Sequence, residues 1–299
     1  MQAKLFGSRI SPFVEKVARA LQLKRVPFTL VAPRSPADFK RWNPQTRKMP
    51  AVEIGAQRLF DSTLILRRLD QLVPEPPFLD RDAAVAARQR FLEDWSDESL
   101  YWYAMALRWS DANTEATTTQ VVGSISVPAA LRPVLKVILR RQIRGQARAQ
   151  GLARLPLETI VDELGRRFDE LLVWLGDRPY FFADRPSVAD LALFGQLNAL
   201  QSGPTPQAER LVAERPHLAD YFLRVDTATA ERRAESDRPA ARGVDLGGAA
   251  ERCLGQLGRL TPRRPAVHSS TTRRAVRKAS SASSREMSAS ASVSVSSSP

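Results

Sequence analysis

The hydrophobic pattern of this chain changes at a proline-rich segment, Val73 to Phe78 (VPEPPF). Before this segment, short apolar runs typical of strands alternate with amphipathic stretches typical of helices. After it, apolar residues recur only at helical spacing, as far as about residue 229. Because clustered prolines favour irregular structure, we interpret the segment as a linker. The pattern therefore predicts two domains, at residues 1–76 and 80–229.

The first domain is predicted to be an α/β unit. Ser11 and Pro12 mark the start of its first helix, because serine is favoured at the N-cap and proline at the first helical position. The expected elements, in chain order, are a strand at Ala3 to Phe6, a helix from Ser11, a strand at Val26 to Val31, a helix around Asp38 to Trp42, two strands around Gly55 and a helix from Ser62 to Leu72. The order β-α-β-α-β-β-α is that of a thioredoxin-like domain.

The second domain is predicted to contain helices only. The fold class is therefore α+β with two domains, an N-terminal thioredoxin-like domain followed by an all-α helical bundle. Long helices are expected at residues 82–111, 131–150 and 157–175. A loop or break is expected at Thr114 to Thr119, because this stretch is polar and β-branched.

A change of composition marks the end of the second domain. The apolar pattern weakens from Ala230, and beyond Thr261 the sequence is mostly Ser, Ala and Arg. Such a segment buries too little apolar surface to offset the entropy of ordering, so residues 230–299 are predicted to form a mostly disordered basic tail.

The positive charge of the chain is concentrated in this tail. Residues Arg259 to Pro299 hold eight Lys and Arg against one Glu, and the remaining residues carry +6 of the total formal charge of +13. This distribution predicts no specific nucleic-acid partner. It is compatible with a weak contact between the basic tail and an acidic membrane surface.

The single cysteine, Cys253, excludes an intrachain disulfide, a CxxC redox pair and a cysteine-based zinc site. His217 is the only histidine before the tail, which argues against a metal site and against a Ser/His nucleophile. Polar residues interrupt every apolar run of the N-terminal segment, which argues against a signal peptide, and no later run is long enough to span a bilayer. We therefore expect a cytoplasmic location.

Three segments carry the strongest motifs. Ser11-Pro12-Phe13 opens the first helix, and Ser187 to Asp190 (SVAD) is a capping box before the apolar run LALF. Between them, Asn43 to Asp70 (NPQTRKMPAVEIGAQRLFDSTLILRRLD) combines an Asn-Pro turn, a Met-Pro step and a helix that begins at Asp-Ser. Together, over about residues 3–228, these segments resemble the glutathione transferase superfamily of the cytosolic type.

The resemblance implies that a hydroxyl near the start of the first helix binds the thiolate of glutathione. Ser11 stands where omega-type members have the cysteine of a Cys-Pro-Phe motif, and many other classes use serine or tyrosine near this place. A hydroxyl at a helix N-terminus can donate to a thiolate while the helix dipole favours its negative charge. Ser11 is thus the candidate catalytic residue; Ser8, in the same loop, is an alternative, and N-capping alone is a second alternative for Ser11.

The resemblance places the peptide-binding residues in the second segment. It implies that Pro50 is a cis-proline that turns the backbone of Met49 outward to pair with the cysteinyl part of glutathione. Asp61 and Ser62 would meet the γ-glutamyl end, and Lys48 is also assigned to glutathione binding. Asp61 departs from the family pattern, since it is one methylene shorter than the usual Glu or Gln. Helix capping is the alternative role for Asp61 and Ser62.

Two further features concern the helical domain. The box at Ser187 to Asp190 is expected to stabilise a buried helix and to take no part in catalysis. Trp95, Trp102 and Trp109 are seven residues apart, which predicts one helical face and a place in the core. This tryptophan-rich stretch also looks similar to the failed axon connections and metaxin branch, whose members are not generally established as transferases.

The resemblance as a whole implies an enzyme that conjugates glutathione, its co-substrate, to a small-molecule electrophile, and that forms a homodimer. The alternative is a non-catalytic interaction module with the glutathione transferase fold, of the failed axon connections/metaxin type.

Overall fold

The computed structural model describes residues 1–125 and 127–230. The predicted tail, from residue 231 onward, lies outside these residues. Both predicted domains fall within one compact unit, Met1–Arg233. The domain boundaries proposed from the sequence remain predictions.

The first part of the chain has the predicted order of strands and helices. Its elements are β1 (Ala3–Phe6), α1 (Pro12–Leu23), β2 (Phe28–Val31), α2 (Pro36–Trp42), β3 (Ala51–Ile54), β4 (Gln57–Phe60) and α3 (Ser62–Leu72). Within the described residues the strands form one mixed sheet of order β2-β1-β3-β4, in which β1 is parallel to β2 and antiparallel to β3. The thioredoxin-like fold class is therefore confirmed.

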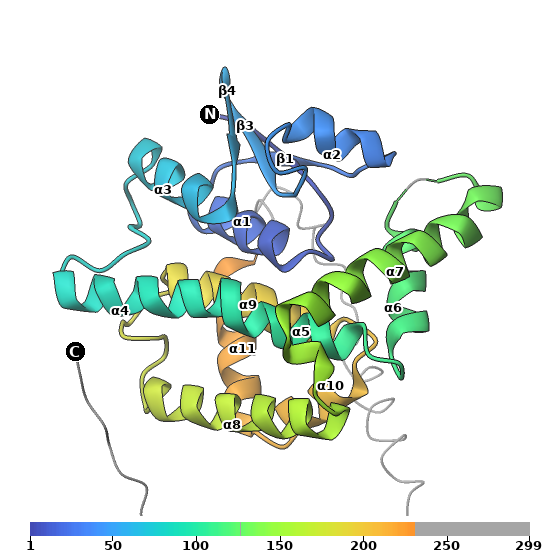
Figure 1. Cartoon of the computed structure of the whole chain (residues 1–299). Coiled ribbons are helices and arrows are strands. Elements are labelled where there is room, and N and C mark those ends of the chain that lie inside the picture. The colour runs from blue at the N-terminus through green and yellow to red at the C-terminus, as the bar shows by residue number, and fades with distance from the viewer. Residues whose placement is uncertain (126, 231–299) are drawn as a thin grey trace, which may run out of the picture. The chain divides into compact units, whose positions relative to one another are not determined.

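The two faces of this sheet are covered by different helices (Figure 1). Successive strand residues point to opposite faces, so neighbouring residues of β1 meet different partners. Leu5 packs with Val17 and Leu21 of α1, and all three side chains are fully buried. Phe6 packs on the other face against Trp42 of α2, with 5.2 Å between the ring centroids.

The second part is helical, as predicted. Its helices are α4 (Ala83–Asp94), η1 (Trp95–Leu100), α5 (Tyr101–Arg108), α6 (Thr114–Gly123), η2 (Ala129–Leu131), α7 (Arg132–Gln150), η3 (Leu152–Arg154), α8 (Leu157–Leu175), α9 (Val188–Gln201), α10 (Pro206–Ala213) and α11 (Pro216–Thr229). α9 contributes Leu191 to the core beneath the sheet and Leu193 and Leu197 to the core of the helical bundle. One buried helix thus belongs to both cores.

The expectation of a loop or break at Thr114 to Thr119 is wrong, because this stretch lies in α6. Thr117 and Thr118 are completely buried, and the hydroxyl of Thr117 donates to the backbone carbonyl of Arg108 at 2.7 Å. The hydroxyl of Thr118 donates to the carbonyl of Thr114 within the helix, at 2.5 Å. Burial and these hydrogen bonds outweigh the low helix propensity of threonine.

The long helix predicted at residues 82–111 contains a π-helical turn, η1. Because a π turn holds more residues than an α turn, the spacing of seven between Trp95 and Trp102, which crosses η1, no longer returns to the same face. Trp109 is buried as expected, whereas Trp95 and Trp102 are only partly buried. Tyr101 packs instead against Phe13 of α1, with 5.1 Å between the ring centroids.

The predicted capping box at the start of α9 is present. Asp190 is fully buried, and its carboxylate accepts hydrogen bonds from both the backbone N–H and the hydroxyl of Ser187, each at 2.8 Å. It also accepts from the Phe181 N–H at 3.0 Å and from the Tyr221 hydroxyl at 2.9 Å. Burial raises the pKa of Asp190 above its ordinary value, while these hydrogen bonds oppose the rise. The hydrogen bonds of Asp190 therefore hold α9 to α11 and to the segment that precedes α9.

α1 and α9 are in backbone contact at one glycine. A Cβ atom at Gly195 would lie 2.4 Å from the carbonyl oxygen of Pro12, and backbone atoms cannot swing away as a side chain can. The close approach therefore requires a residue without a side chain at this position.

We predict that Gly195→Ala lowers the free energy of unfolding by about 1–3 kcal/mol, because the new methyl group forces α1 and α9 apart. Gly145→Ala is the matched control, since that helical glycine has no atom within 4 Å of a built Cβ. The control should be more stable than the wild type by about 0.5–1 kcal/mol. Urea denaturation of both variants measures the difference, and equal effects would contradict the close contact.

Candidate functional site

One end of β1, β3 and β4 lies at the same side of the sheet, across the strand direction, and this side is called the sheet edge below. Phe6, the last residue of β1, pairs with Ala51, the first residue of β3, and Ala51 pairs with Phe60, the last residue of β4. The segments that follow β1, precede β3 and follow β4 therefore meet at this edge. They are residues 7–11, 48–50 and 61–62, which include every site residue predicted from the sequence.

Gly7 brings the first two of these segments together. Its φ is +148°, and a Cβ atom there would lie 2.5 Å from Cγ2 of Val14 and 3.2 Å from the sulfur of Met49. A side chain at this position would push the loop away from both neighbours. Glycine is thus required for the loop after β1 to reach the start of β3.

Ser11 occupies the N-cap position of α1, but within the described residues its side chain makes no capping hydrogen bond. Its backbone N–H donates to the carbonyl of Ser8 at 2.9 Å, which closes the loop. The hydroxyl of Ser8 likewise has no hydrogen-bond partner in the described part of the chain, and both serines are half-buried. Two hydroxyls with unused hydrogen-bonding capacity therefore stand near the positive end of the α1 dipole.

The peptide bond between Met49 and Pro50 is cis, the geometry that the resemblance implies. Met49 is half-buried, and no hydrogen bond within residues 1–125 and 127–230 engages its backbone N–H or C=O. Lys48 has an exposed side chain, and its carbonyl accepts a hydrogen bond from the Asn43 side chain at 3.2 Å. The backbone at Met49 can therefore pair with an extended peptide.

Asp61 and Ser62 differ in the two roles that the sequence left open for them, helix capping and glutathione binding. Asp61 is the N-cap of α3, and its carboxylate accepts a hydrogen bond from the Leu64 N–H at 3.1 Å. It has φ +69° and ψ +127°, which is a strained conformation for a residue with a side chain. Ser62 is buried, yet its hydroxyl has no hydrogen-bond partner among the described residues. Capping thus accounts for one oxygen of Asp61 and leaves Ser62 without an assigned role.

A buried ionic cluster lies behind this edge, and the sequence analysis missed it. The Lys16 ammonium group of α1 contacts Glu93 at 2.7 Å, Asp97 at 2.5 Å and the Thr63 hydroxyl at 3.2 Å. The Lys16 side chain is 1% exposed. Since Thr63 directly follows Ser62, the cluster fixes the start of α3 to α1 and to the π turn.

The charges of this cluster depend on one another. Burial raises the pKa of Asp97 to about 6, although the Lys16 ammonium group opposes the rise. Burial alone would lower the pKa of Lys16, but Asp97 and Glu93 outweigh it and hold that pKa above its ordinary value. Asp61 also raises the pKa of Asp97, and one oxygen of Asp97 is buried without a hydrogen-bond partner in the described chain. Two carboxylates therefore stand close enough to interact at the start of α3.

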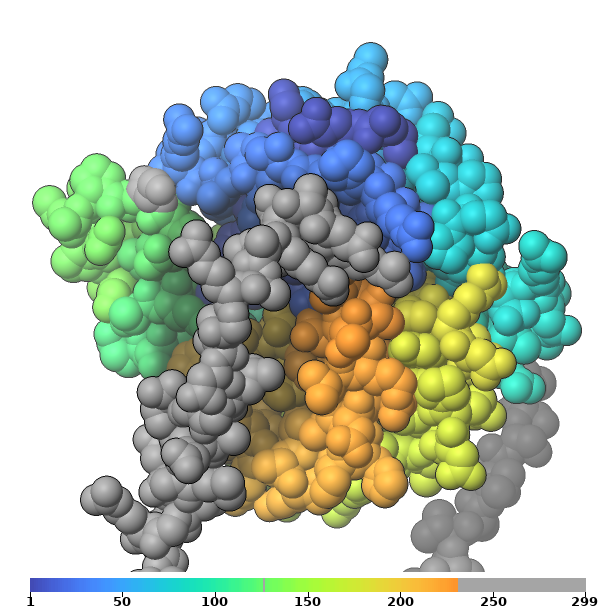
Figure 2. Space-filling model, turned by 180° about the vertical axis from the view of Figure 1, so that it is seen from behind, coloured from blue at the N-terminus to red at the C-terminus, as the bar shows by residue number. Residues whose placement is uncertain are grey.

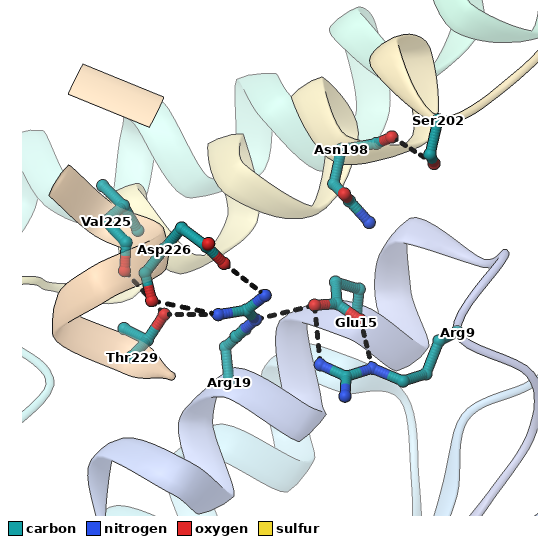
Figure 3. Close-up of polar contacts among 8 residues, drawn as sticks. All are labelled: Arg9, Glu15, Arg19, Asn198, Ser202, Val225, Asp226 and Thr229. Atoms are coloured by element: carbon teal, nitrogen blue, oxygen red, sulfur yellow. Dashed lines mark hydrogen bonds and ion pairs between the residues drawn. The ribbon is translucent and has the colours of Figure 1, made fainter. Parts of the chain in front are cut away.

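A second ionic network holds the loop that carries both serines (Figure 3). Arg9 donates two hydrogen bonds to the carboxylate of Glu15, at 2.6 and 2.8 Å. Arg19 donates to the same carboxylate at 2.7 Å and also bonds to Asp226 and Thr229 of α11. Burial would raise the pKa of Glu15, but the hydrogen bonds from the two arginines hold it below its ordinary value. The loop is thus connected through α1 to the last turn of α11.

The described residues contain neither a metal site nor a membrane-spanning helix. No group of His, Cys, Asp and Glu side chains in residues 1–125 and 127–230 could hold a metal ion. No helix in the same residues is long and apolar enough to cross a membrane.

Fold and site together define a thioredoxin-like protein with an all-helical second domain. Residues 5–77 match the family described as glutathione S-transferase, N-terminal domain, and residues 165–225 match glutathione S-transferase, C-terminal domain. The chain is thus similar to glutathione S-transferases in both its N-terminal and its C-terminal part.

Individual relatives agree with this similarity. The chain is 33% identical over 100 residues to glutathione S-transferase U2 of Arabidopsis thaliana, a match that covers 32% of this chain and 44% of that protein. It is 32% identical over 108 residues to glutathione transferase GST 23 of Zea mays, covering 33% and 48%. The chain thus spans less than half the length of these curated relatives.

Solved structures match over a longer stretch. The apo form of glutathione S-transferase III superimposes with a TM-score of 0.55 at 20% identity, over 82% of this chain and 100% of that chain. A glutathione S-transferase from Methylobacterium radiotolerans, in complex with glutathione sulfonate, gives 0.51 at 24% identity with the same coverage. At these identities the similarity establishes the fold.

We predict that Lys16→Met lowers the free energy of unfolding by about 3–5 kcal/mol at neutral pH, because Glu93 and Asp97 remain buried without a cation. The loss should shrink as the pH falls toward about 6, the pKa of Asp97 beside Lys16, because without the ammonium group Asp97 takes up its proton at a higher pH and then needs no counter-charge. Lys4→Met is the control, because Lys4 is 64% exposed and 3.9 Å from its partner Glu53. It should cost less than about 1 kcal/mol. A similar loss in both variants, measured by urea denaturation, would show that the cluster does not hold the fold.

Proposed function

We propose that the protein is an enzyme that binds glutathione and conjugates it to a small-molecule electrophile. One observation carries this proposal: the sheet edge at residues 7–11, 48–50 and 61–62 gathers hydroxyl and backbone groups with unused hydrogen-bonding capacity. The names of the matched families and relatives support it, as does the glutathione sulfonate named with the bacterial structure.

Each part of glutathione has a chemically suitable partner at this edge. We assign the backbone of Met49, beside Pro50, to the cysteinyl part, because its N–H and C=O can pair as a strand would. Ser62 and the free N–H groups at the start of α3 suit the γ-glutamyl carboxylate. The free oxygen of Asp61 suits the γ-glutamyl ammonium group, and Lys48 supplies a cation for a carboxylate of the peptide.

We assign thiol activation to Ser11. Its hydroxyl donates a hydrogen bond to the sulfur and stabilises the thiolate more than the thiol, so the thiol pKa falls. The first turn of α1 adds its unpaired N–H groups and the positive end of its dipole. The thiol releases its proton to solvent, the thiolate forms a C–S bond to the electrophile, and the electrophile expels its leaving group as an anion; no bond forms to the protein. Ser8 remains the alternative donor.

The exposed apolar residues near α3 and α4 support the proposed homodimer. Leu64 is 54% exposed and Phe91 is 76% exposed. Leu64 is on α3 and Phe91 on α4, two helices that the bond between the Thr63 hydroxyl and Glu93 joins at 3.0 Å. A second copy of the chain could cover both side chains.

Two further proposals follow from the sequence. We propose a cytoplasmic location, and a weak contact between the basic residues after Arg259 and an acidic membrane surface. The alternative to the enzyme is a non-catalytic interaction module of the failed axon connections/metaxin type, and none of the relatives named above bears such a name.

Glutathione should raise the melting temperature, because it binds the native state in preference to the unfolded chain. At 100 times its Kd the stabilisation would be about 2.7 kcal/mol. Ser62→Ala should reduce the shift, whereas Thr119→Ala, a change at an exposed hydroxyl on α6, should leave it unchanged. Differential scanning fluorimetry up to millimolar glutathione measures the shift. No shift for the wild type would favour the interaction module.

Because the Ser11 side chain makes no capping hydrogen bond, replacing it tests the catalytic role separately from helix capping. Ser11→Ala should change stability by less than about 0.5 kcal/mol, because no capping bond is lost. It should nevertheless raise the pKa of bound thiol, and so the pH profile of conjugation, by about 1–2 units, since a hydrogen bond to a charged group contributes about 1.5–3 kcal/mol. Stopped-flow or steady-state conjugation of a chloronitroarene measures the profile.

Two companion variants separate the alternatives for this site. Ser11→Asp should fold but conjugate poorly, because it places a negative charge where the thiolate must lie. Ser8→Ala should leave the pH profile unchanged. If Ser8→Ala shifts the profile and Ser11→Ala does not, the thiolate donor is Ser8.

A further inference from the structure

α7 and the residue at its N-cap position, Leu131, expose a row of apolar side chains. Leu131, Val134, Val137 and Ile138 are 54–67% exposed. At 100° per residue all four lie on one side of the helix. Scattered exposed apolar residues need no explanation, but a row on one helical face marks an interaction surface.

Ion pairs fix which side of α7 faces the protein. Lys136 and Arg140 both pair with Glu115 of α6, and Arg144 pairs with Asp111. These basic residues lie on the same side as Ala147, which is buried. α7 therefore packs through the side that carries these basic residues and the half-buried Leu135, Leu139 and Ile143, and it leaves the apolar row in solvent.

Beyond the apolar row, toward the C-terminal end of α7, the same side of the helix carries positive charge. Arg141 lies three residues after Ile138, and Arg148 lies two turns further on, so both guanidinium groups fall on the exposed side. Neither has an ion-pair partner among the described residues. α7 contains no acidic residue, so nothing on the helix itself neutralises this face.

The helix is placed where a flat surface can reach it. α6 and α7 form a hairpin at the side of the molecule (Figure 1), and the space-filling view from behind shows the hairpin as a protruding green lobe (Figure 2). The apolar row and Arg141 are all exposed.

We propose that this face, the α7 surface (Leu131, Val134, Val137, Ile138, Arg141 and Arg148), binds an anionic lipid surface. Aliphatic side chains that enter the acyl boundary, beside cations that meet the headgroups, are the composition of an interfacial helix. A protein partner is less well matched, because the surface has no aromatic anchor of the kind that dominates protein interfaces.

Sedimentation of the full chain with vesicles tests the apolar row. With phosphatidylcholine vesicles that contain phosphatidylglycerol, Val137→Asp/Ile138→Asp should weaken binding roughly tenfold or more, because two inserted side chains become anionic. Val173→Asp is the matched control, since Val173 is 80% exposed on α8. It should bind as the wild type does. Circular dichroism checks that each variant is folded.

A second pair of variants tests the charges. Arg141→Glu/Arg148→Glu should lose most binding to the same vesicles, whereas Arg166→Glu/Arg210→Glu, with the same change of net charge elsewhere on the helical bundle, should lose much less. Vesicles of phosphatidylcholine alone should bind the wild type weakly. Raised salt should weaken wild-type binding only in part, because the apolar row is not screened, but should abolish the residual binding of Val137→Asp/Ile138→Asp.

Three results would overturn the proposal. The first is that Val137→Asp/Ile138→Asp binds vesicles as strongly as the wild type. The second is that the wild type binds neutral and anionic vesicles equally. The third is that the α7 variants change their oligomeric state on gel filtration while their vesicle binding stays the same. The last result would identify the α7 surface as a contact between copies of the chain. None of these measurements contains glutathione, so they are independent of the proposed enzymatic function.

Discussion

The contact between α1 and α9 sets the position of most of the groups discussed above. α9 belongs to both cores, and at Gly195 it approaches the backbone of α1 so closely that only a hydrogen atom fits. The carbonyl that it meets is that of Pro12, the residue directly after Ser11. The position of the Ser11 hydroxyl therefore depends on α9, the most deeply buried helix of the helical part. Lys16, one turn further along α1, is fully buried, and there it balances two carboxylates.

Much of the fold follows from local sequence patterns. The order of strands and helices up to residue 72, the helical second part and the capping box at Ser187 are all predicted, because each depends on periodicity, turn residues or a cap. The errors come from tertiary contacts. The stretch Thr114 to Thr119 becomes helical through burial and hydrogen bonds to carbonyls, and the π turn at Trp95–Leu100 changes which tryptophans reach the core.

The candidate site was predictable only in part. Motifs and a family resemblance located the three segments that meet at the sheet edge, but no pattern shows that the side chain of Ser11 is uncapped. The Lys16 cluster joins residues 77 and 81 positions apart, a pairing that a single sequence does not reveal. One local signal existed: Glu93 and Asp97 are like charges four residues apart on a helix, an arrangement that is unfavourable unless a cation from elsewhere lies between them.

The carboxylate of Glu15 has a consequence for local stability. Both of its oxygens are engaged by arginines, one from the loop after β1 and one whose other bonds reach Asp226 and Thr229. Fraying of the last turn of α11 removes the bonds of Arg19 to Asp226 and Thr229, and so removes part of what orients Arg19 toward Glu15. The order of the loop is therefore coupled to the protection of that terminal turn against hydrogen exchange, although more than two hundred residues separate them.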